Sequence, residues 1–186
     1  MAVNNFPRLT LVSGPASSGK SRWAEHLALG SGCAIIYIAT GPSLPDDPSW
    51  QLRLARHRQR RPANWQVWEV AADLAPALER LDVASLGLVD SLGTWVAAHL
   101  ERDNASWVQL RNELIAVIAA GGAPLVVVVE ECGWGVVPPT VAGGRFRERL
   151  GELQQRLAVQ AGASWLVVQG RALDLNSLGT ALPGEA

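Results

Sequence analysis

The residues with the clearest chemistry lie near the start of the chain, in a short loop with a glycine at each end. The loop reads Gly14-Pro15-Ala16-Ser17-Ser18-Gly19-Lys20-Ser21, between an apolar run at 9–13 and a stretch of helical pattern at 22–29. In such a loop the backbone N–H groups and the positive end of the following helix bind phosphate. Lys20 supplies a positive charge for terminal phosphates, and Ser21 supplies a hydroxyl for Mg²⁺. The sequence therefore predicts a nucleotide-binding P-loop.

Carboxylates follow two later apolar runs, where a magnesium ligand of a P-loop enzyme is expected. Asp90 follows the run 86–89, and Glu130 and Glu131 follow the more hydrophobic run 125–129. We expect Asp90 to contact the metal, directly or through water, or to contact the nucleotide. The alternative is a carboxylate that only stabilises a helix N-terminus. Spacing alone does not choose between Glu130 and Glu131.

Basic residues are concentrated in one segment, R-L-A-R-H-R-Q-R-R-P at 53–62. One interpretation is a solvated surface helix or a nucleic-acid contact. The other places the segment near the P-loop, where arginines hold phosphates and His57 acts as a nucleophile. Neighbouring arginines disfavour the protonated form of His57, which favours a neutral imidazole. Both interpretations remain open on composition, and solvated basic helices are the commoner case.

Alternating strands and helices must position these residues. Strands are expected at 9–13, 34–39, 65–70, 86–90, 125–129 and 165–168, and helices at 22–29, 49–61, 74–81, 95–119 with an interruption near 102–106, and 140–161. This order predicts an α/β, P-loop NTPase-like three-layer sandwich with a mainly parallel central sheet flanked by helices. We expect residues 1–170 to form a single domain and residues 171–186 to be a partly disordered C-terminal tail. Functional residues should gather at the carboxyl ends of the strands.

Composition narrows the expected partners and compartment. The chain of 186 residues has a formal net charge of -1, which is no reason to expect nucleic acid or an anionic membrane as partner. Its two cysteines are too few for a disulfide framework and indicate free thiols in a reducing compartment. We see no signal leader and no apolar stretch long enough to span a bilayer. We therefore expect a cytoplasmic protein without a membrane span.

Several motifs together resemble one enzyme family. They are G-P-A-S-S-G-K-S-R, Y-I-A-T, R-L-A-R-H-R-Q-R-R-P, V-D-S-L-G-T-W and E-C-G-W-G-V-V-P-P. In this order they resemble the bifunctional adenosylcobinamide kinase/adenosylcobinamide-phosphate guanylyltransferase family of cobalamin biosynthesis. The likeness runs from about position 9 to position 170. A P-loop is shared with many proteins, whereas the H-R-x-x-R-P and G-W-G-x-V-P blocks are far more specific.

The resemblance implies two reactions and a set of site residues. In the first, ATP or GTP phosphorylates the hydroxyl of the aminopropanol arm of adenosylcobinamide. In the second, a histidine that matches His57 takes GMP from GTP and passes it to the phosphorylated corrinoid, giving adenosylcobinamide-GDP. The implied catalytic residues are His57 and Lys20, and the implied metal ligands are Ser21 and Asp90. The implied nucleotide contacts are Gly14, Pro15, Ala16, Ser17, Ser18, Gly19, Lys20, Ser21, Ala39, Thr40, Gly41, Arg58, Gln59, Arg60, Arg61, Glu69 and Asp90.

The resemblance also implies nucleotide and corrinoid substrates, Mg²⁺ and a homotrimer. The chain departs from the family pattern in two places: Ser49-Trp50 replaces an acidic residue and a methionine, and Ser91-Leu92-Gly93-Thr94-Trp95 replaces C-L-T-L-W. Two other functions stay as alternatives. One is a small-molecule P-loop kinase with a single activity, and the other is a non-enzymatic nucleotide-binding module whose basic helix contacts nucleic acid.

Overall fold

The computed structural model describes residues 6–183, which form one seven-stranded sheet between two layers of helices. The strand order is β3-β2-β4-β5-β1-β6-β7, and every neighbouring pair is parallel except β6 and β7. The strands are β1 (Leu9–Gly14), β2 (Ala34–Ala39), β3 (Gln66–Glu69), β4 (Ser85–Asp90), β5 (Leu125–Glu130), β6 (Ala163–Val168) and β7 (Arg171–Asp174). The predicted α/β fold with a mainly parallel sheet is confirmed.

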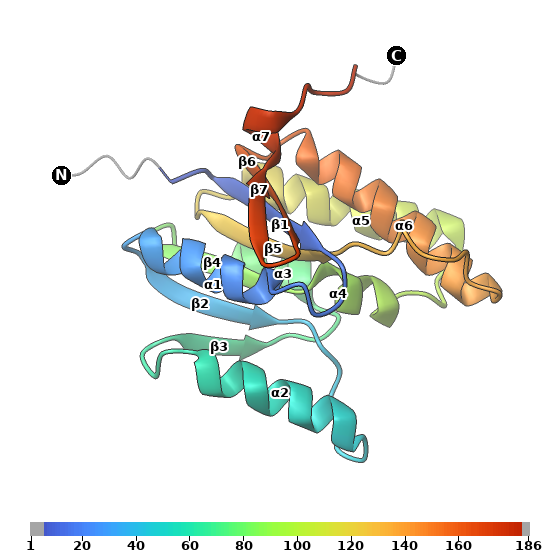
Figure 1. Ribbon diagram of the computed structural model, residues 1–186, viewed down its shortest axis with the longest axis horizontal. Coiled ribbons are helices and arrows are strands. Elements are labelled where there is room, and N and C mark those ends of the chain that lie inside the picture. Colours follow the sequence, from blue (N-terminus) through green and yellow to red (C-terminus); the bar gives the residue numbers. More distant parts are fainter. Residues whose placement is uncertain (1–5, 184–186) are drawn as a thin grey trace.

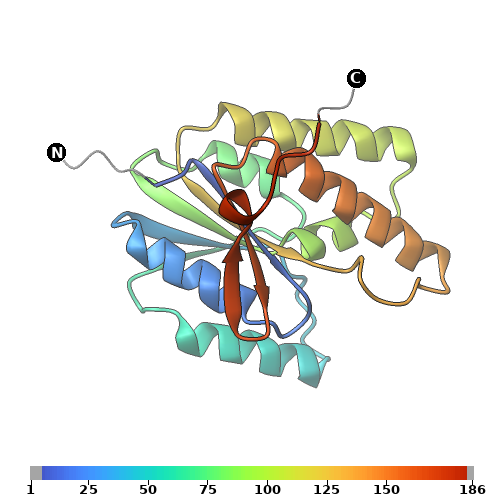
Figure 2. The ribbon, with the colours of Figure 1, turned by 45° about the horizontal axis from the view of Figure 1, so that its top comes forward.

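The helices that connect these strands cover both faces of the sheet. They are α1 (Lys20–Gly30), α2 (Pro48–Arg60), α3 (Leu74–Glu79), α4 (Leu92–Ala98), α5 (Asn104–Ala120), α6 (Val141–Ala158) and α7 (Leu175–Leu178). Figure 2 shows α5 and α6 on one side of the sheet and α1 and α2 on the other. In Figure 1, α2 lies at the margin of the molecule beside the edge strand β3.

Polar caps explain where the helices around the site begin. The Asp47 side chain accepts hydrogen bonds from the backbone N–H groups of Ser49 and Trp50, at 2.9 and 3.0 Å, and Pro48 stands in the first turn. Asp103 caps α5 by accepting from the N–H of Ser106 at 2.8 Å. The interruption expected near 102–106 is therefore a true break between α4 and α5.

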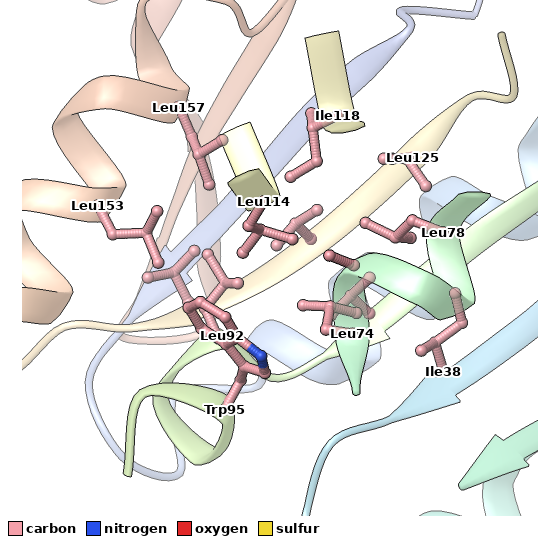
Figure 3. Close-up of a cluster of buried hydrophobic side chains, with 14 of the residues drawn as sticks. Ile38, Leu74, Leu78, Leu92, Trp95, Leu114, Ile118, Leu125, Leu153 and Leu157 are labelled. Carbon is pink, nitrogen blue, oxygen red and sulfur yellow. The ribbon is translucent and has the colours of Figure 1, made fainter. Parts of the chain in front are cut away.

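Two clusters of buried apolar side chains hold the layers together, one on each face of the sheet. The larger cluster joins α3, α4, α5 and α6 to the sheet, and Figure 3 shows Leu92, Leu114 and Leu153 meeting within it. The strand β5 reads Leu-Val-Val-Val-Val before Glu130, and these five residues are buried. Such a run is typical of a central parallel strand that is covered on both faces.

The C-terminal segment contains two elements that the sequence analysis did not predict. Residues 171–178, assigned there to the tail, form β7 and α7, and β7 pairs antiparallel with β6. Residues 184–186 of that tail lie outside the described residues. Among the described residues, no helix has the length and apolarity that a membrane span requires.

Leu114 tests the contribution of the larger cluster, because its side chain is fully buried between α5 and the sheet. We expect Leu114→Ala to lower the free energy of unfolding by about 2–5 kcal/mol through lost burial and a new cavity. Urea denaturation measures this. The matched control is Val159→Ala, at an 89% exposed position, which should change stability by less than about 0.5 kcal/mol. Equal losses in the two variants would contradict the assigned core.

Candidate active site

The P-loop has the local shape that its sequence predicts. Gly14 ends β1, Lys20 begins α1, and Gly19 between them adopts the left-handed conformation with φ of 97°. Only glycine fits at position 14, because a Cβ atom there would collide with the carbonyl oxygen of Val167. Lys20 is buried, and its Nζ donates to the carbonyl oxygen of Pro15 at 3.3 Å. The loop therefore carries an internal positive charge before any phosphate binds.

The strand ends that were expected to meet do lie on one edge of the sheet. In the register of the ladders, Gly14 stands beside Glu130, and Ala39 stands between Asp90 and Glu69. Residues far apart in the sequence are neighbours here because parallel strands bring their carboxyl ends to the same edge.

Asp90 is the central group of this edge. Its side chain is 8% exposed, and its Oδ2 accepts a hydrogen bond of 2.7 Å from the Tyr37 hydroxyl. Burial alone would raise the pKa of Asp90, but hydrogen bonds from His57, Tyr37 and Ser21 outweigh burial and hold the pKa below its ordinary value. Burial and the adjacent carboxylate raise the pKa of Tyr37, which keeps its proton as a donor. Asp90 is thus an ionised, buried acceptor.

His57 reaches this carboxylate from α2. Its Nδ1 lies 3.4 Å from Oδ2 of Asp90, and its side chain is 17% exposed. An Nη2 atom of Arg60 lies 3.5 Å from the same Nδ1. In the sequence the charged neighbours of His57 are arginines, whereas in the fold the Asp90 carboxylate accepts from its ring.

Arg60 links α2, which carries His57, to α1, which follows the P-loop. Its Nε and Nη2 atoms contact the two carboxylate oxygens of Glu25 on α1, at 3.3 and 3.1 Å. Glu25 is buried, whereas the Arg60 side chain is 38% exposed. The hydrogen bond to Glu25 raises the pKa of Arg60. A bidentate pair of this kind fixes orientation as well as distance, so it sets where α2 lies against α1.

The other basic residues of this segment divide between the interior and the surface. The Arg61 guanidinium lies 4.2 Å from the centre of the Tyr37 ring. Its buried Nη1 has no hydrogen-bond acceptor among the residues that the structure describes. Arg58 and Glu69 form an exposed ion pair of 3.3 Å, and Gln59 is exposed. The interpretation as a purely solvated basic helix is therefore wrong for His57, Arg60 and Arg61.

A pocket of about 400 Å³ opens between α2 and the ends of β2, β3 and β4. His57 and Asp90 lie at one wall, and Trp50, Gly41 and Glu69 line other parts of it. The volume lies within the usual range for small-molecule sites.

The two adjacent glutamates separate clearly in three dimensions. The Glu130 carboxylate accepts from the backbone N–H of Gly93 at 2.8 Å and from the hydroxyl of Ser91. Glu131 turns to its own loop and accepts from the N–H of Gly133 at 2.7 Å. Glu130 therefore supports the turn that follows Asp90, and neither glutamate contacts the carboxylate of Asp90 in the hydrogen bonds described.

Ser21 and Asp90 are close enough to hydrogen-bond, which is the arrangement that a magnesium ion between them requires. The described residues contain no cluster of three or more His, Cys, Asp or Glu side chains that could hold a metal. Mg²⁺ commonly uses one or two protein ligands together with phosphates and water. The residues present therefore fit Mg²⁺ bound with a nucleotide rather than a metal held by protein alone.

Comparisons with known proteins assign the chain to a family. Residues 10–175 match the family model described as cobinamide kinase / cobinamide phosphate guanyltransferase. The chain belongs to this family. It is 36% identical over 180 residues to the bifunctional adenosylcobalamin biosynthesis protein CobU of Salmonella typhimurium, covering 87% of this chain and 96% of the relative. The protein of the same name from Escherichia coli is 33% identical over 179 residues, with the same coverage of each chain.

A third relative has a different name. The bifunctional adenosylcobalamin biosynthesis protein CobP of Pseudomonas aeruginosa is 34% identical over 167 residues, covering 89% of this chain and 95% of that protein. These matches confirm the resemblance found in the motifs. The two activities of the family exclude a non-enzymatic binding module.

Solved structures confirm the fold at lower similarity. A prototypical ATPase from the type III secretion system of pathogenic bacteria superposes with a TM-score of 0.57 at 13% identity, covering 92% of this chain and 53% of that one. A protein from Pyrococcus horikoshii OT3 superposes with a TM-score of 0.54 at 8% identity, covering 90% and 85%.

The residues that depart from the family's motif pattern make specific contacts in the structure. At position 93 a Cβ atom would collide with the Glu130 carboxylate, so glycine allows Glu130 to reach the backbone. The Thr94 hydroxyl lies 2.6 Å from the Thr40 hydroxyl, which joins the ends of β2 and β4. Trp50 lines the pocket, and its Nε1 donates to the carbonyl oxygen of Pro42 at 2.9 Å.

Tyr37 and Glu25 are site residues that sequence reasoning missed. Tyr37 lies inside the apolar run 34–39, where its ring reads as core packing, and Glu25 reads as an ordinary polar position of α1. The unusual feature of each is that a polar group is buried. Burial of a single residue is not visible in a sequence, although a lone tyrosine in the Y-I-A-T motif was a usable signal.

The lowered pKa of Asp90 predicts a pH-dependent stability difference. Above the ordinary aspartate pKa of about 3.9 the ionised carboxylate stabilises the folded state, and this contribution disappears as the pH falls through the lower folded pKa. We therefore expect Asp90→Asn to lower the free energy of unfolding at pH 7, and the deficit relative to wild type to shrink in acid.

Urea denaturation between pH 7 and acid measures this difference. Asp46→Asn, at an exposed position in the loop before α2, is the control and should show no comparable pH-dependent deficit. If Asp90→Asn lowered the free energy of unfolding by the same amount at every pH in this range, the Asp90 carboxylate would not be ionised and hydrogen-bonded in the folded state.

Proposed function

We propose that both family reactions take place at the single edge formed by the P-loop, Asp90 and His57. ATP or GTP first phosphorylates the hydroxyl of the aminopropanol arm of adenosylcobinamide. GTP then gives its GMP unit to His57, and adenosylcobinamide phosphate takes GMP from the histidine to form adenosylcobinamide-GDP. The observation that carries this proposal is the 3.4 Å contact between His57 Nδ1 and Asp90 Oδ2, on the same sheet edge as the P-loop, whose Ser21 also contacts Asp90.

The carboxylate prepares the histidine for attack. When Nδ1 carries the proton and donates it to Asp90, the lone pair of the imidazole is on Nε2. Nε2 attacks the α-phosphorus, a nitrogen–phosphorus bond forms, and the bond to the bridging oxygen breaks as pyrophosphate leaves with the electron pair. In the second displacement, a phosphate oxygen of the corrinoid attacks the same phosphorus and the nitrogen–phosphorus bond breaks. Nδ1 keeps its proton through both steps.

Positive groups around the pocket stabilise the phosphates of the nucleotide. In this proposal the P-loop residues 14–21 hold the triphosphate, with Lys20 at its terminal phosphates. Arg61 offers a buried Nη1 that finds no acceptor in residues 6–183, which fits an oxygen of the α-phosphate or of the departing pyrophosphate. Arg60 is held by Glu25, so its part is to keep His57 in place rather than to bind phosphate.

The nucleoside takes the remainder of the pocket. Residues 39–41 lie at the end of β2, and the Arg58–Glu69 ion pair joins α2 to β3 at the pocket wall. Gln59, exposed next to Arg58 on α2, completes the proposed contacts. The Glu69 carboxylate accepts from the guanine ring or from the ribose. Mg²⁺ would be held by Ser21 and Asp90 with nucleotide phosphates, and it supplies neutralisation of phosphate charge.

We further propose a cytoplasmic homotrimer. The compartment is supported by Cys33 and Cys132, which are both free thiols, because free cysteines suit a reducing environment. The proposal of a trimer is supported by the resemblance of the motifs to those of the family.

The covalent step is tested with GTP radiolabelled at the α-phosphorus. We expect acid-labile, base-stable label on the wild-type protein and none on His57→Ala, because only the phosphoramidate carries label. The control is His26→Ala on α1, whose exposed ring stacks on Trp23 away from the pocket and should leave labelling intact. Undiminished label on His57→Ala would refute His57 as the residue that carries GMP, and phosphorylation of cobinamide without any label would indicate a kinase alone.

Tyr37→Phe tests the positioning of His57 through Asp90. The substitution removes the hydroxyl that holds Asp90 Oδ2 and keeps the ring beneath Arg61. We expect the maximal rate of His57 labelling to fall about tenfold, equivalent to about 1.4 kcal/mol, with little change in the GTP concentration for half-maximal rate. Rapid-quench labelling over a range of GTP concentrations separates the two constants. An unchanged maximal rate would show that the hydroxyl does not position the pair.

A further inference from the structure

A second hollow of about 490 Å³ opens on the same edge of the sheet, between the end of β5 and α6. Its walls include Glu131 and Val137 from the loop that joins these elements, and Arg147, Glu148 and Gln154 from α6. In Figure 2 this orange loop leaves the end of β5 and runs outward to the start of α6. The nucleotide chemistry proposed above does not use this hollow.

The hollow adjoins the P-loop on the face of the sheet that α6 covers, whereas the nucleoside pocket lies under α2 on the other face. The backbone N–H of Glu131 donates to the carbonyl oxygen of Gly14 at 2.8 Å, so the first loop residue is tied to the first P-loop glycine. The nucleoside pocket lies at β2, β3 and β4, whereas this hollow lies at β5 and α6. In phosphoryl transfer the attacking and leaving oxygens lie roughly in line. An acceptor hydroxyl must therefore approach the terminal phosphate from the side that the nucleotide leaves free.

The walls of the hollow are acidic. Glu130, Glu131 and Glu148 face a single base, Arg147, whose Nη2 donates to the carbonyl oxygen of Gly133 at 2.7 Å. A nucleotide would be repelled by such walls, because its phosphates are negative. A cation with amide N–H groups would be attracted, because carboxylates accept from both.

The joining loop forms an apolar, exposed rim beside the hollow: Val137 lines the hollow itself, and Trp134 and Val136 adjoin its lining residues Gly133 and Val137 in the chain. Trp134, Val136 and Val137 of the joining loop are 63%, 94% and 68% exposed. Valines and an indole at a rim offer contact to a large flat apolar surface. Three exposed side chains on one loop present much less than the roughly 800 Å² that each partner buries in a stable protein interface.

We propose that this hollow and its rim are the acceptor subsite, occupied by the cobinamide macrocycle. A corrin ring around trivalent cobalt with one alkyl ligand is a flat cation with apolar faces and an amide-bearing rim. The ring face lies against Trp134 and the valines, the amides and positive charge lie toward the glutamates, and the aminopropanol arm extends to the P-loop. This inference rests on the proposed function, because it places the second substrate of that reaction.

Trp134→Ala in the full chain tests the subsite, with Val137→Ala as a second variant. We expect the KM for cobinamide in the kinase step to rise about tenfold in Trp134→Ala and less in Val137→Ala, with the KM for ATP unchanged. The rate of His57 labelling by GTP should stay at the wild-type value, because that reaction precedes corrinoid binding. Val83→Ala is the matched control, since this 70% exposed valine lies before β4 at the opposite edge of the sheet.

Three results would overturn the subsite, and they differ in what they leave standing. An unchanged KM for cobinamide in Trp134→Ala, with normal His57 labelling, would remove the subsite and keep the proposed function. A change of oligomeric state in sedimentation velocity, with the KM for cobinamide unchanged, would assign the loop to contacts between copies of this chain. Absence of both labelling and phosphorylation in the wild type would remove the proposed function and the subsite with it.

Discussion

One buried carboxylate organises the functional edge of this protein. Asp90 ends a central strand and accepts hydrogen bonds from Tyr37 on the neighbouring strand, from His57 on α2 and from Ser21 on α1. A buried charge is tolerated only when several donors satisfy it, and here each donor comes from a different element. The ionised Asp90 carboxylate therefore connects α1, β2 and α2 at one site.

The basic helix owes its place to a second interaction of the same kind. The bidentate contact of Arg60 with buried Glu25 ties α2 to α1, although α2 otherwise lies at the margin of the sheet. Arg61 covers Tyr37, and His57 is thereby presented with one nitrogen toward Asp90. The arginines of this segment therefore lie in different environments. Arg60 anchors α2 to α1, Arg61 lines the pocket, and Arg58 forms an exposed ion pair with Glu69.

The two hollows at this edge differ in electrostatic character, and the difference matches two substrates. The pocket beside His57 is lined by Arg61, whose buried Nη1 has no acceptor among the described residues, which suits phosphate. The hollow beside β5 has three glutamates against one arginine and an exposed apolar rim, which suits a cationic ring. The P-loop touches residues of both, through Ser21 at Asp90 and through Gly14 at Glu131, so one triphosphate site can serve phosphoryl transfer to an acceptor in one hollow and nucleotidyl transfer to the histidine in the other.

Local patterns in the sequence determined the P-loop, the buried strands and the residues at their ends, because glycine conformations, apolar runs and helix caps act over a few neighbouring residues. They also singled out His57, although its role came from the family resemblance. The tertiary structure decided the rest: the contact of His57 with Asp90, the donor Tyr37, the anchor Glu25, and the separate directions of Glu130 and Glu131. Strand β7 was missed for the same reason, since its four residues are ordered by pairing with β6 rather than by any pattern of their own. Contacts between distant residues depend on the packing of whole elements, and a sequence shows which residues are present without showing which of them meet.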